Sequence, residues 1–86
     1  MTHVLIYTTE FCSYCVTAKK LLEKKSIPYS EIRIDTDPAQ REEMIKKTNR
    51  YTVPQIFING THVGGCDDLY ALERSGQLDK LLNTER

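Results

Sequence analysis

The sequence predicts an α/β fold in which a four-stranded mixed sheet carries helices on both faces. In the first half of the chain, short apolar segments of strand character alternate with segments of helical spacing. In the second half, Asn59-Gly60 lies between two apolar runs, which is typical of a tight hairpin. The predicted order is therefore β-α-β-α-β-β-α with a short final helix, and such an order favours a mixed sheet.

The first strand is expected at residues 3–7, where continuous apolar character indicates a strand that is covered on both faces. Residues 13–25 place apolar side chains at helical spacing, and Pro28 interrupts this pattern shortly afterwards. Residues 29–34 alternate in polarity, so we expect a second strand there.

The second helix has clear start and stop signals. Asp37 suits the N-cap and Pro38 suits the first helical position, which has no N–H to lose. The helix is expected to run to about Lys47, and Asn49 is suited to end it in a left-handed conformation.

The last part of the chain is expected to form a hairpin and two helices. Residues 55–58 and 61–63 are the predicted hairpin strands, and Gly64-Gly65 ends the second of them. A third helix follows at 66–75, and leucines at helical spacing predict a short helix at 78–82.

Length and composition limit the possible functions. With 86 residues, we expect residues 1–86 to form a single domain. The 12 Lys and Arg balance the 12 Asp and Glu, which argues against nucleic acid or an anionic membrane as the main partner. Apolar runs cover only a few residues, so we expect no signal peptide and no membrane span, and a cytoplasmic location.

Two cysteines, Cys12 and Cys15, lie where the first strand ends and the first helix begins. Unpaired N–H groups at a helix start carry the positive end of the helix dipole and stabilise a thiolate, which is the reactive form. Cys12 is expected nearest to these groups, with Cys15 one turn further along, close enough to close a disulfide. A C-x-x-C beside a strand–helix–strand pattern is typical of thioredoxin-like redox proteins.

The same cysteines would also be half of a zinc site, which needs two more ligands. Cys66, His3 and His62 are the candidates, and the sequence has no second C-x-x-C. We therefore predict a redox pair and no metal site. Structural disulfides are not expected, because the cytoplasm keeps thiols reduced.

Three motifs taken together resemble one family. They are Cys12-Ser13-Tyr14-Cys15, Thr52-Val53-Pro54-Gln55-Ile56-Phe57-Ile58 and Gly64-Gly65-Cys66-Asp67-Asp68-Leu69, with support from Arg41-Glu42-Glu43-Met44-Ile45. Over nearly its whole length the chain resembles the glutaredoxins, specifically their short bacterial dithiol, glutaredoxin 3-like class. The resemblance implies a thioredoxin-like fold and a glutathione-dependent thiol–disulfide oxidoreductase that reduces protein disulfides and glutathione mixed disulfides.

The resemblance also implies the roles of individual residues on the first side of the site. Cys12 matches the catalytic nucleophile and Cys15 the resolving cysteine. Thr52 and Val53 match a segment that pairs like a strand with glutathione, an interaction that uses the main chain. Pro54 matches a proline whose preceding peptide bond is cis, which turns the backbone toward the site.

The other side of the implied glutathione site begins the third helix. Gly65 and Cys66 bring helix N-terminal amides that suit a carboxylate, and Asp67 suits an ammonium group. Tyr14 matches an aromatic residue beside the nucleophile. Asp67 also suits a plain N-cap, and the Cys66 thiol also suits a small buried group without chemistry. The implied glutathione contacts are Cys12, Tyr14, Thr52, Val53, Pro54, Gly65, Cys66 and Asp67.

The sequence departs from the family pattern in two places. Many relatives have proline where Ser13 stands, and many have a lysine where this chain has Thr8-Thr9. Arg50 and Lys19 are the candidates to replace that positive charge. The implied partners are glutathione, as the reducing co-substrate, and disulfide-containing or glutathionylated proteins, with the chain acting as a monomer.

Two other functions stay open at this point. Some glutaredoxins, mainly ones that lack proline in the motif, hold a [2Fe–2S] cluster between two protomers through the nucleophilic cysteine and bound glutathione, and Ser13 leaves this alternative open. A thioredoxin-like reductant served by thioredoxin reductase is the second alternative. The chain contains no Trp, so it lacks the Trp-Cys-Gly-Pro-Cys motif of that family.

Overall fold

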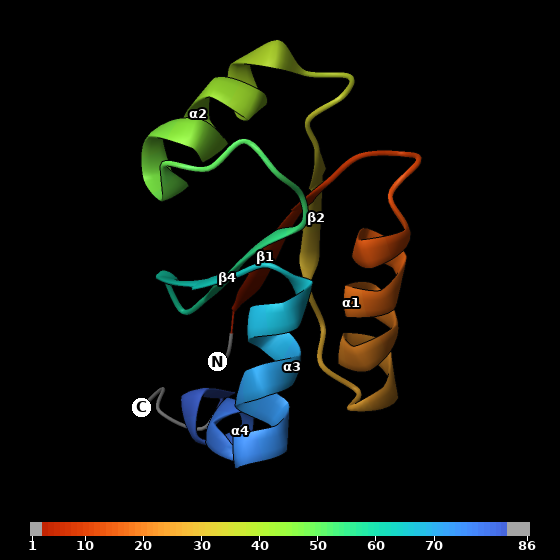
Figure 1. The fold of residues 1–86 in the computed structure, drawn as a ribbon, viewed down its shortest axis with the longest axis vertical. Coiled ribbons are helices and arrows are strands. Elements are labelled where there is room, and N and C mark those ends of the chain that lie inside the picture. The colour runs from red at the N-terminus through yellow and green to blue at the C-terminus, as the bar shows by residue number, and fades with distance from the viewer. Residues whose placement is uncertain (1–2, 83–86) are drawn as a thin grey trace.

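Strand β1 (Val4–Thr8) is an inner strand of the sheet and lies between two other strands in the computed structural model (Figure 1). It pairs in parallel with β2 (Ser30–Arg33) and antiparallel with β3 (Gln55–Ile58). β3 in turn pairs antiparallel with β4 (Thr61–Gly64), so the order is β2-β1-β3-β4. The structure describes residues 3–82, and the predicted four-stranded mixed sheet is confirmed.

Within the described residues, four helices cover the two faces of this sheet (Figure 1). They are α1 (Ser13–Lys24), α2 (Pro38–Thr48), α3 (Cys66–Ser75) and α4 (Gln77–Leu82). Helices α1 and α3 contact one another, while α2 lies apart from them. The fold is thioredoxin-like, with helices on both faces as predicted.

Each face of the sheet buries its own apolar cluster, because successive side chains of a strand point to opposite faces. On the side of α1 and α3, fully buried Ile6 and Ile56 pack with Leu22 and Leu69. On the side of α2, the buried residues are Tyr7, Ile34 and Met44. The two clusters hold the carboxyl end of β1 between the helices, and the chain enters the C-x-x-C segment from that end.

The predicted local signals are present at α2. The Asp37 side chain accepts a hydrogen bond from the Gln40 backbone N–H at 3.4 Å, and Asn49 ends the helix with a φ of 59°. Most predicted boundaries are right to within one or two residues. Gly64 differs from the prediction: it was expected to follow the strand and break it, and it is instead the last residue of β4. Within residues 3–82, no helix is long and apolar enough to cross a membrane.

Candidate active site

Cys12 is the N-cap of α1, as the sequence predicted. Its backbone is extended, with a φ of −140°, and its Sγ accepts a hydrogen bond from the Cys15 backbone N–H at 3.1 Å. A sulfur atom thus takes the place of the side-chain oxygen that usually caps a helix. The arrangement directs a positively polarised N–H of the helix start at the sulfur.

Cys15 has a very different environment, although it lies only one turn away. It is buried, with 1% of its surface exposed. Burial raises the pKa of the Cys15 thiol to about 12, and a hydrogen bond with the Cys12 side chain acts in the same direction. From the sequence, the helix start was expected to stabilise a thiolate less at Cys15 than at Cys12. In the structure, burial moves the pKa of Cys15 in the opposite direction and raises it. In the reduced protein, Cys15 is therefore a protonated thiol held beside the surface cysteine.

We expect alkylation to separate the two cysteines in the native protein. At about pH 8.5, iodoacetamide should modify the partly exposed Cys12 and leave the buried Cys15 almost untouched. Because the pKa of Cys15 is raised to about 12, its modification should increase only at much higher pH. Mass spectrometry of the cysteine peptides measures both rates, and a denatured sample is the control in which they should converge. Equal rates in the native protein would contradict this picture.

The loop before β3 approaches the same sulfur. The Val53 carbonyl oxygen lies 3.8 Å from the Cys12 Sγ, although the two residues are 41 positions apart in the chain. The Val53–Pro54 peptide bond is cis, which confirms the prediction for Pro54. The loop thus brings Thr52 and Val53 to the side of the nucleophile, where the sequence motif predicted them.

The start of α3 forms the third part of the site. Gly65 is the N-cap, and its N–H donates to Asp68 Oδ2 at 2.9 Å. The interpretation of Asp67 as a plain N-cap is therefore wrong, because the cap lies two residues earlier and Asp68 supplies the capping carboxylate. Asp67 lies in the first turn with its side chain exposed. Its carboxylate is thus available to a ligand.

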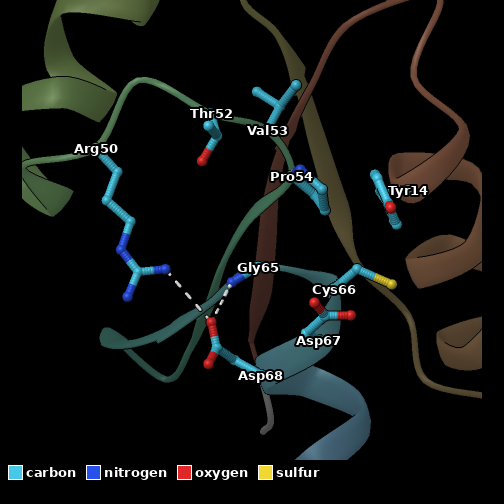
Figure 2. A pocket seen from close by; sticks show the side chains of 9 residues that line it. All are labelled: Tyr14, Arg50, Thr52, Val53, Pro54, Gly65, Cys66, Asp67 and Asp68. Atoms are coloured by element: carbon cyan, nitrogen blue, oxygen red, sulfur yellow. Dashed lines mark hydrogen bonds and ion pairs between the residues drawn. The ribbon is translucent and has the colours of Figure 1, made fainter.

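These three segments enclose a cavity of about 300 Å³ (Figure 2). Its lining consists of Tyr14, Arg50, Thr52, Val53, Pro54, Gly65, Cys66, Asp67 and Asp68. Every predicted glutathione contact except Cys12 is in this set, and Cys12 lies at its edge through the contact with Val53. The structure thus brings together lining residues that the chain keeps up to 54 positions apart.

Two charged residues of the lining were not among the predicted contacts. Arg50 Nη1 lies 3.3 Å from Asp68 Oδ2. Figure 2 shows the Arg50 side chain reaching from the loop toward Asp68 at the start of α3. The Gly65 N–H and then Arg50 lower the pKa of Asp68. An acidic residue three positions after a cap is a recognisable capping-box signal. Asp68 was therefore detectable from sequence.

Of the two residues considered as substitutes for the missing lysine, only Arg50 lines the cavity. Lys19 instead pairs with Glu31 at 2.9 Å, and Glu31 also accepts a hydrogen bond from Thr8 Oγ1 at 2.6 Å. These interactions hold Lys19 against β2. Arg50 therefore supplies the cationic group of the cavity.

The Cys66 thiol has the properties of a small buried group. Only 7% of this residue is exposed, and burial raises the pKa of its thiol, with the neighbouring Asp67 charge acting in the same direction. The thiol is therefore protonated and shielded at neutral pH. Within residues 3–82, no group of three or more His, Cys, Asp or Glu side chains is arranged to hold a metal ion.

The chemistry that this arrangement suits is thiol–disulfide exchange next to a ligand cleft. A partly exposed cysteine at a helix N-cap is able to attack a disulfide. A buried cysteine one turn away is able to attack the resulting mixed disulfide and release the bound substrate. The adjacent cavity offers backbone groups, a carboxylate and a guanidinium. This combination offers partners of both charges to a ligand bound beside Cys12.

Sequence comparisons place the chain among known redox proteins. The family model described as Glutaredoxin matches residues 4–63. Glutaredoxin 3 of Escherichia coli strain K12 is 57% identical over 82 residues, which cover 95% of this chain and 99% of the relative. A glutaredoxin of Pseudomonas aeruginosa is 54% identical over 83 residues, covering 96% and 99%.

The fold is also similar to those of solved glutaredoxin structures. The solution structure of glutaredoxin from Brucella melitensis superposes with a TM-score of 0.87 at 51% identity, covering 100% of this chain and 94% of that one. A buckwheat glutaredoxin–glutathione complex superposes with a TM-score of 0.86 at 32% identity, covering 92% and 74%.

Proposed function

The chain belongs to the glutaredoxin family, and from that premise we propose that it is a glutathione-dependent thiol–disulfide oxidoreductase. Family membership makes it an oxidoreductase that acts on thiols and disulfides. The observation that supports glutathione as its reductant is the cavity between the loop 50–54 and the start of α3, which opens beside Cys12. A relative of the same fold forms a complex with glutathione, which supports the same proposal.

In the dithiol route, the Cys12 thiolate attacks one sulfur of a substrate disulfide, and the other sulfur leaves as a thiolate. Cys15 then loses its proton and attacks the Cys12 sulfur, so that a Cys12–Cys15 disulfide forms and the second substrate thiol is released. One glutathione thiolate opens this disulfide by forming a mixed disulfide with Cys12. A second glutathione attacks that mixed disulfide and leaves the reduced protein and glutathione disulfide.

In the monothiol route, Cys12 attacks the glutathione sulfur of a glutathionylated substrate. The substrate leaves as a thiol, and glutathione stays attached to Cys12. A second glutathione then releases glutathione disulfide, so Cys15 takes no part. The burial of Cys15 is compatible with this route, because no external molecule needs to reach its sulfur.

We place glutathione across the cavity with its sulfur at Cys12. The backbone of Val53 is available for strand-like pairing with the peptide, and the first amides of α3 suit the γ-glutamyl carboxylate. Asp67 suits the ammonium group at the same end. Arg50, which is about half exposed, suits the remaining carboxylate. Each charged group of the tripeptide thus has an opposite charge or a helix terminus in reach.

Protein substrates are the proposed second partner. Phe11 is 93% exposed directly before the nucleophile, and Tyr14 and Val16 are also exposed on the first turn of α1. Exposed apolar side chains around a reactive residue are typical of a surface that contacts other polypeptides. We propose that the protein works as a monomer in the cytoplasm, where a glutathione pool supplies electrons.

The proposal is tested by reduction of a small glutathione mixed disulfide coupled to glutathione reductase. Turnover should saturate with glutathione, and thioredoxin reductase should not replace that system. Turnover that follows thioredoxin reductase and ignores glutathione would favour the thioredoxin-like alternative. Visible absorbance in protein purified without oxygen is the observation that would favour the iron–sulfur alternative.

Asp67→Asn is expected to weaken glutathione without changing the chemistry at Cys12. Loss of a charged partner for the ammonium group should raise the KM for glutathione about tenfold, with kcat little changed. Asp79→Asn is the matched control, because Asp79 is an exposed residue of α4 that pairs with Lys25 and does not line the cavity. If the KM values of both variants equal that of the wild type, the ammonium contact is not at Asp67.

A further inference from the structure

Gln55 is a polar residue in an apolar position. It is the first residue of β3, directly after the cis Pro54, and none of its surface is exposed. Burial of an amide side chain without hydrogen-bond partners costs several kcal/mol, so such a group is expected to have specific partners. Here all of its partners belong to the loop of the cavity or to β4.

The amide group of Gln55 joins two segments. Its Nε2 donates to the Thr52 carbonyl oxygen at 3.0 Å and approaches Thr52 Oγ1 at 3.3 Å, while its Oε1 lies 2.8 Å from His62 Nε2. A carbonyl oxygen only accepts, so the NH₂ group must face Thr52 and the amide oxygen must face the imidazole. It follows that His62 carries its proton on Nε2 and donates it to Gln55.

His62 is itself held in place by a second contact. Its ring packs against the Phe57 ring, with the centroids 5.0 Å apart and the planes at 35°. Burial lowers the pKa of His62, and the charge of Arg50 acts in the same direction, so the ring is neutral at physiological pH. The chain of contacts therefore runs from the aromatic face of the sheet through His62 and Gln55 to Thr52.

Thr52 is exposed and lies in a stretch that belongs to no helix or strand. Its carbonyl and hydroxyl are both engaged by Gln55, immediately before the Val53 backbone that approaches Cys12. A peptide clamp of this kind binds tightly only when its backbone is held in the bound geometry beforehand, because ordering a loop on binding reduces affinity.

We propose that Gln55, oriented by His62, is a positioning residue that holds the Thr52–Val53 backbone ready for glutathione. This inference rests on the proposed function and adds to it two residues that touch neither the ligand nor the reacting sulfurs. Without the hydrogen bonds from this buried amide, the Thr52–Val53 backbone would have to become ordered on binding, and the affinity for glutathione would fall.

The test compares four variants in the glutathione-coupled assay. Gln55→Glu keeps an acceptor for His62 but turns a carboxylate toward the Thr52 carbonyl, and Gln55→Leu removes both contacts. His62→Leu removes the donor to Gln55, while His62→Gln restores an N–H at similar reach. We expect the KM for glutathione to rise about tenfold in the first three variants and to return toward the wild-type value in His62→Gln, with kcat unchanged within about twofold.

Two controls separate positioning from general damage. Ile58→Val removes a buried methylene of β3 from the cluster on the other face of the sheet, so it should lower stability and leave the KM for glutathione unchanged. The rate at which a nitroaromatic disulfide reagent modifies Cys12 needs no clamp, and it should be the same in every variant. A uniform fall in kcat and in this rate, without a change in KM, would contradict the proposal.

Hydrogen exchange of the segment 50–54 in the free protein tests the inference without glutathione. Exchange should be faster in Gln55→Glu, Gln55→Leu and His62→Leu than in the wild type, and His62→Gln should restore protection. Unchanged exchange in all four variants would overturn the inference even if the wild type uses glutathione. If the wild type shows no saturation with glutathione, the proposed function fails instead, and the exchange result still decides the role of Gln55.

Discussion

Replacing Cys12 with serine is expected to abolish every exchange reaction of this protein, whereas replacing Cys15 with serine is expected to abolish only one. Cys12 caps α1 at the edge of the cavity, and both proposed routes begin with its thiolate. Its loss should lower turnover by at least about a thousandfold, as is usual when the nucleophile of a covalent mechanism is removed. Cys15→Ser should still remove glutathione from a glutathionylated substrate but fail to reduce protein disulfides.

Separate assays of a glutathionylated peptide and of a protein disulfide measure the two routes. Cys66→Ser is the control, because that thiol is buried with a raised pKa and should leave both rates near those of the wild type. Full activity of Cys12→Ser would overturn the assignment of the nucleophile. Equal loss of both reactions in Cys15→Ser would show that the monothiol route does not operate.

The parts of this fold that the sequence predicts well are those with local causes. The second helix is an example, since its cap, its first-turn proline and its left-handed terminator all lie within a few residues of the ends they determine. The hairpin at Asn59-Gly60 has the same kind of local cause. The motif at Cys12 was interpretable because a helix start imposes its chemistry on the residue that caps it.

The parts that sequence reasoning missed depend on contacts between distant segments. The ion pair of Arg50 with Asp68 and the amide contact of Gln55 with His62 require the loop, β4 and α3 to be placed first. No spacing rule predicts which polar groups will then meet. Tyr51 of the same loop is 70% exposed although its side chain is large and aromatic. The burial of a single side chain in a loop likewise depends on the whole arrangement.

Gly64→Ala is expected to damage both stability and the cavity, for a reason visible at one residue. Gly64 has a φ of 122°, which side-chain-bearing residues rarely adopt. A Cβ atom at this position would overlap the Asp68 carboxylate. That carboxylate caps α3 through the Gly65 N–H and pairs with Arg50. Backbone strain and the lost cap together should lower the free energy of unfolding by about 2–4 kcal/mol.

Gly60→Ala is the matched control for this variant. Gly60 also has a positive φ, of 85°, but a Cβ there would meet no other atom within 4 Å. It should therefore show only the backbone part of the penalty, about 1 kcal/mol, and an unchanged KM for glutathione. Gly64→Ala should in addition raise that KM, because Asp68 and Arg50 both line the cavity.

The pH dependence of unfolding separates the two causes of the penalty in Gly64→Ala, which are backbone strain and loss of the Asp68 cap. The Gly65 N–H and then Arg50 lower the pKa of Asp68 in the folded state, so its contribution to stability is complete above the unfolded pKa of about 3.9 and is lost as the pH falls through the folded value. At a pH below the folded value, the wild type has lost this contribution. The difference between the wild type and Gly64→Ala should therefore be smaller in acid than at neutral pH, while the difference for Gly60→Ala stays constant. Denaturant titrations at both pH values measure these differences, and a penalty for Gly64→Ala that does not depend on pH would show that backbone strain alone accounts for it.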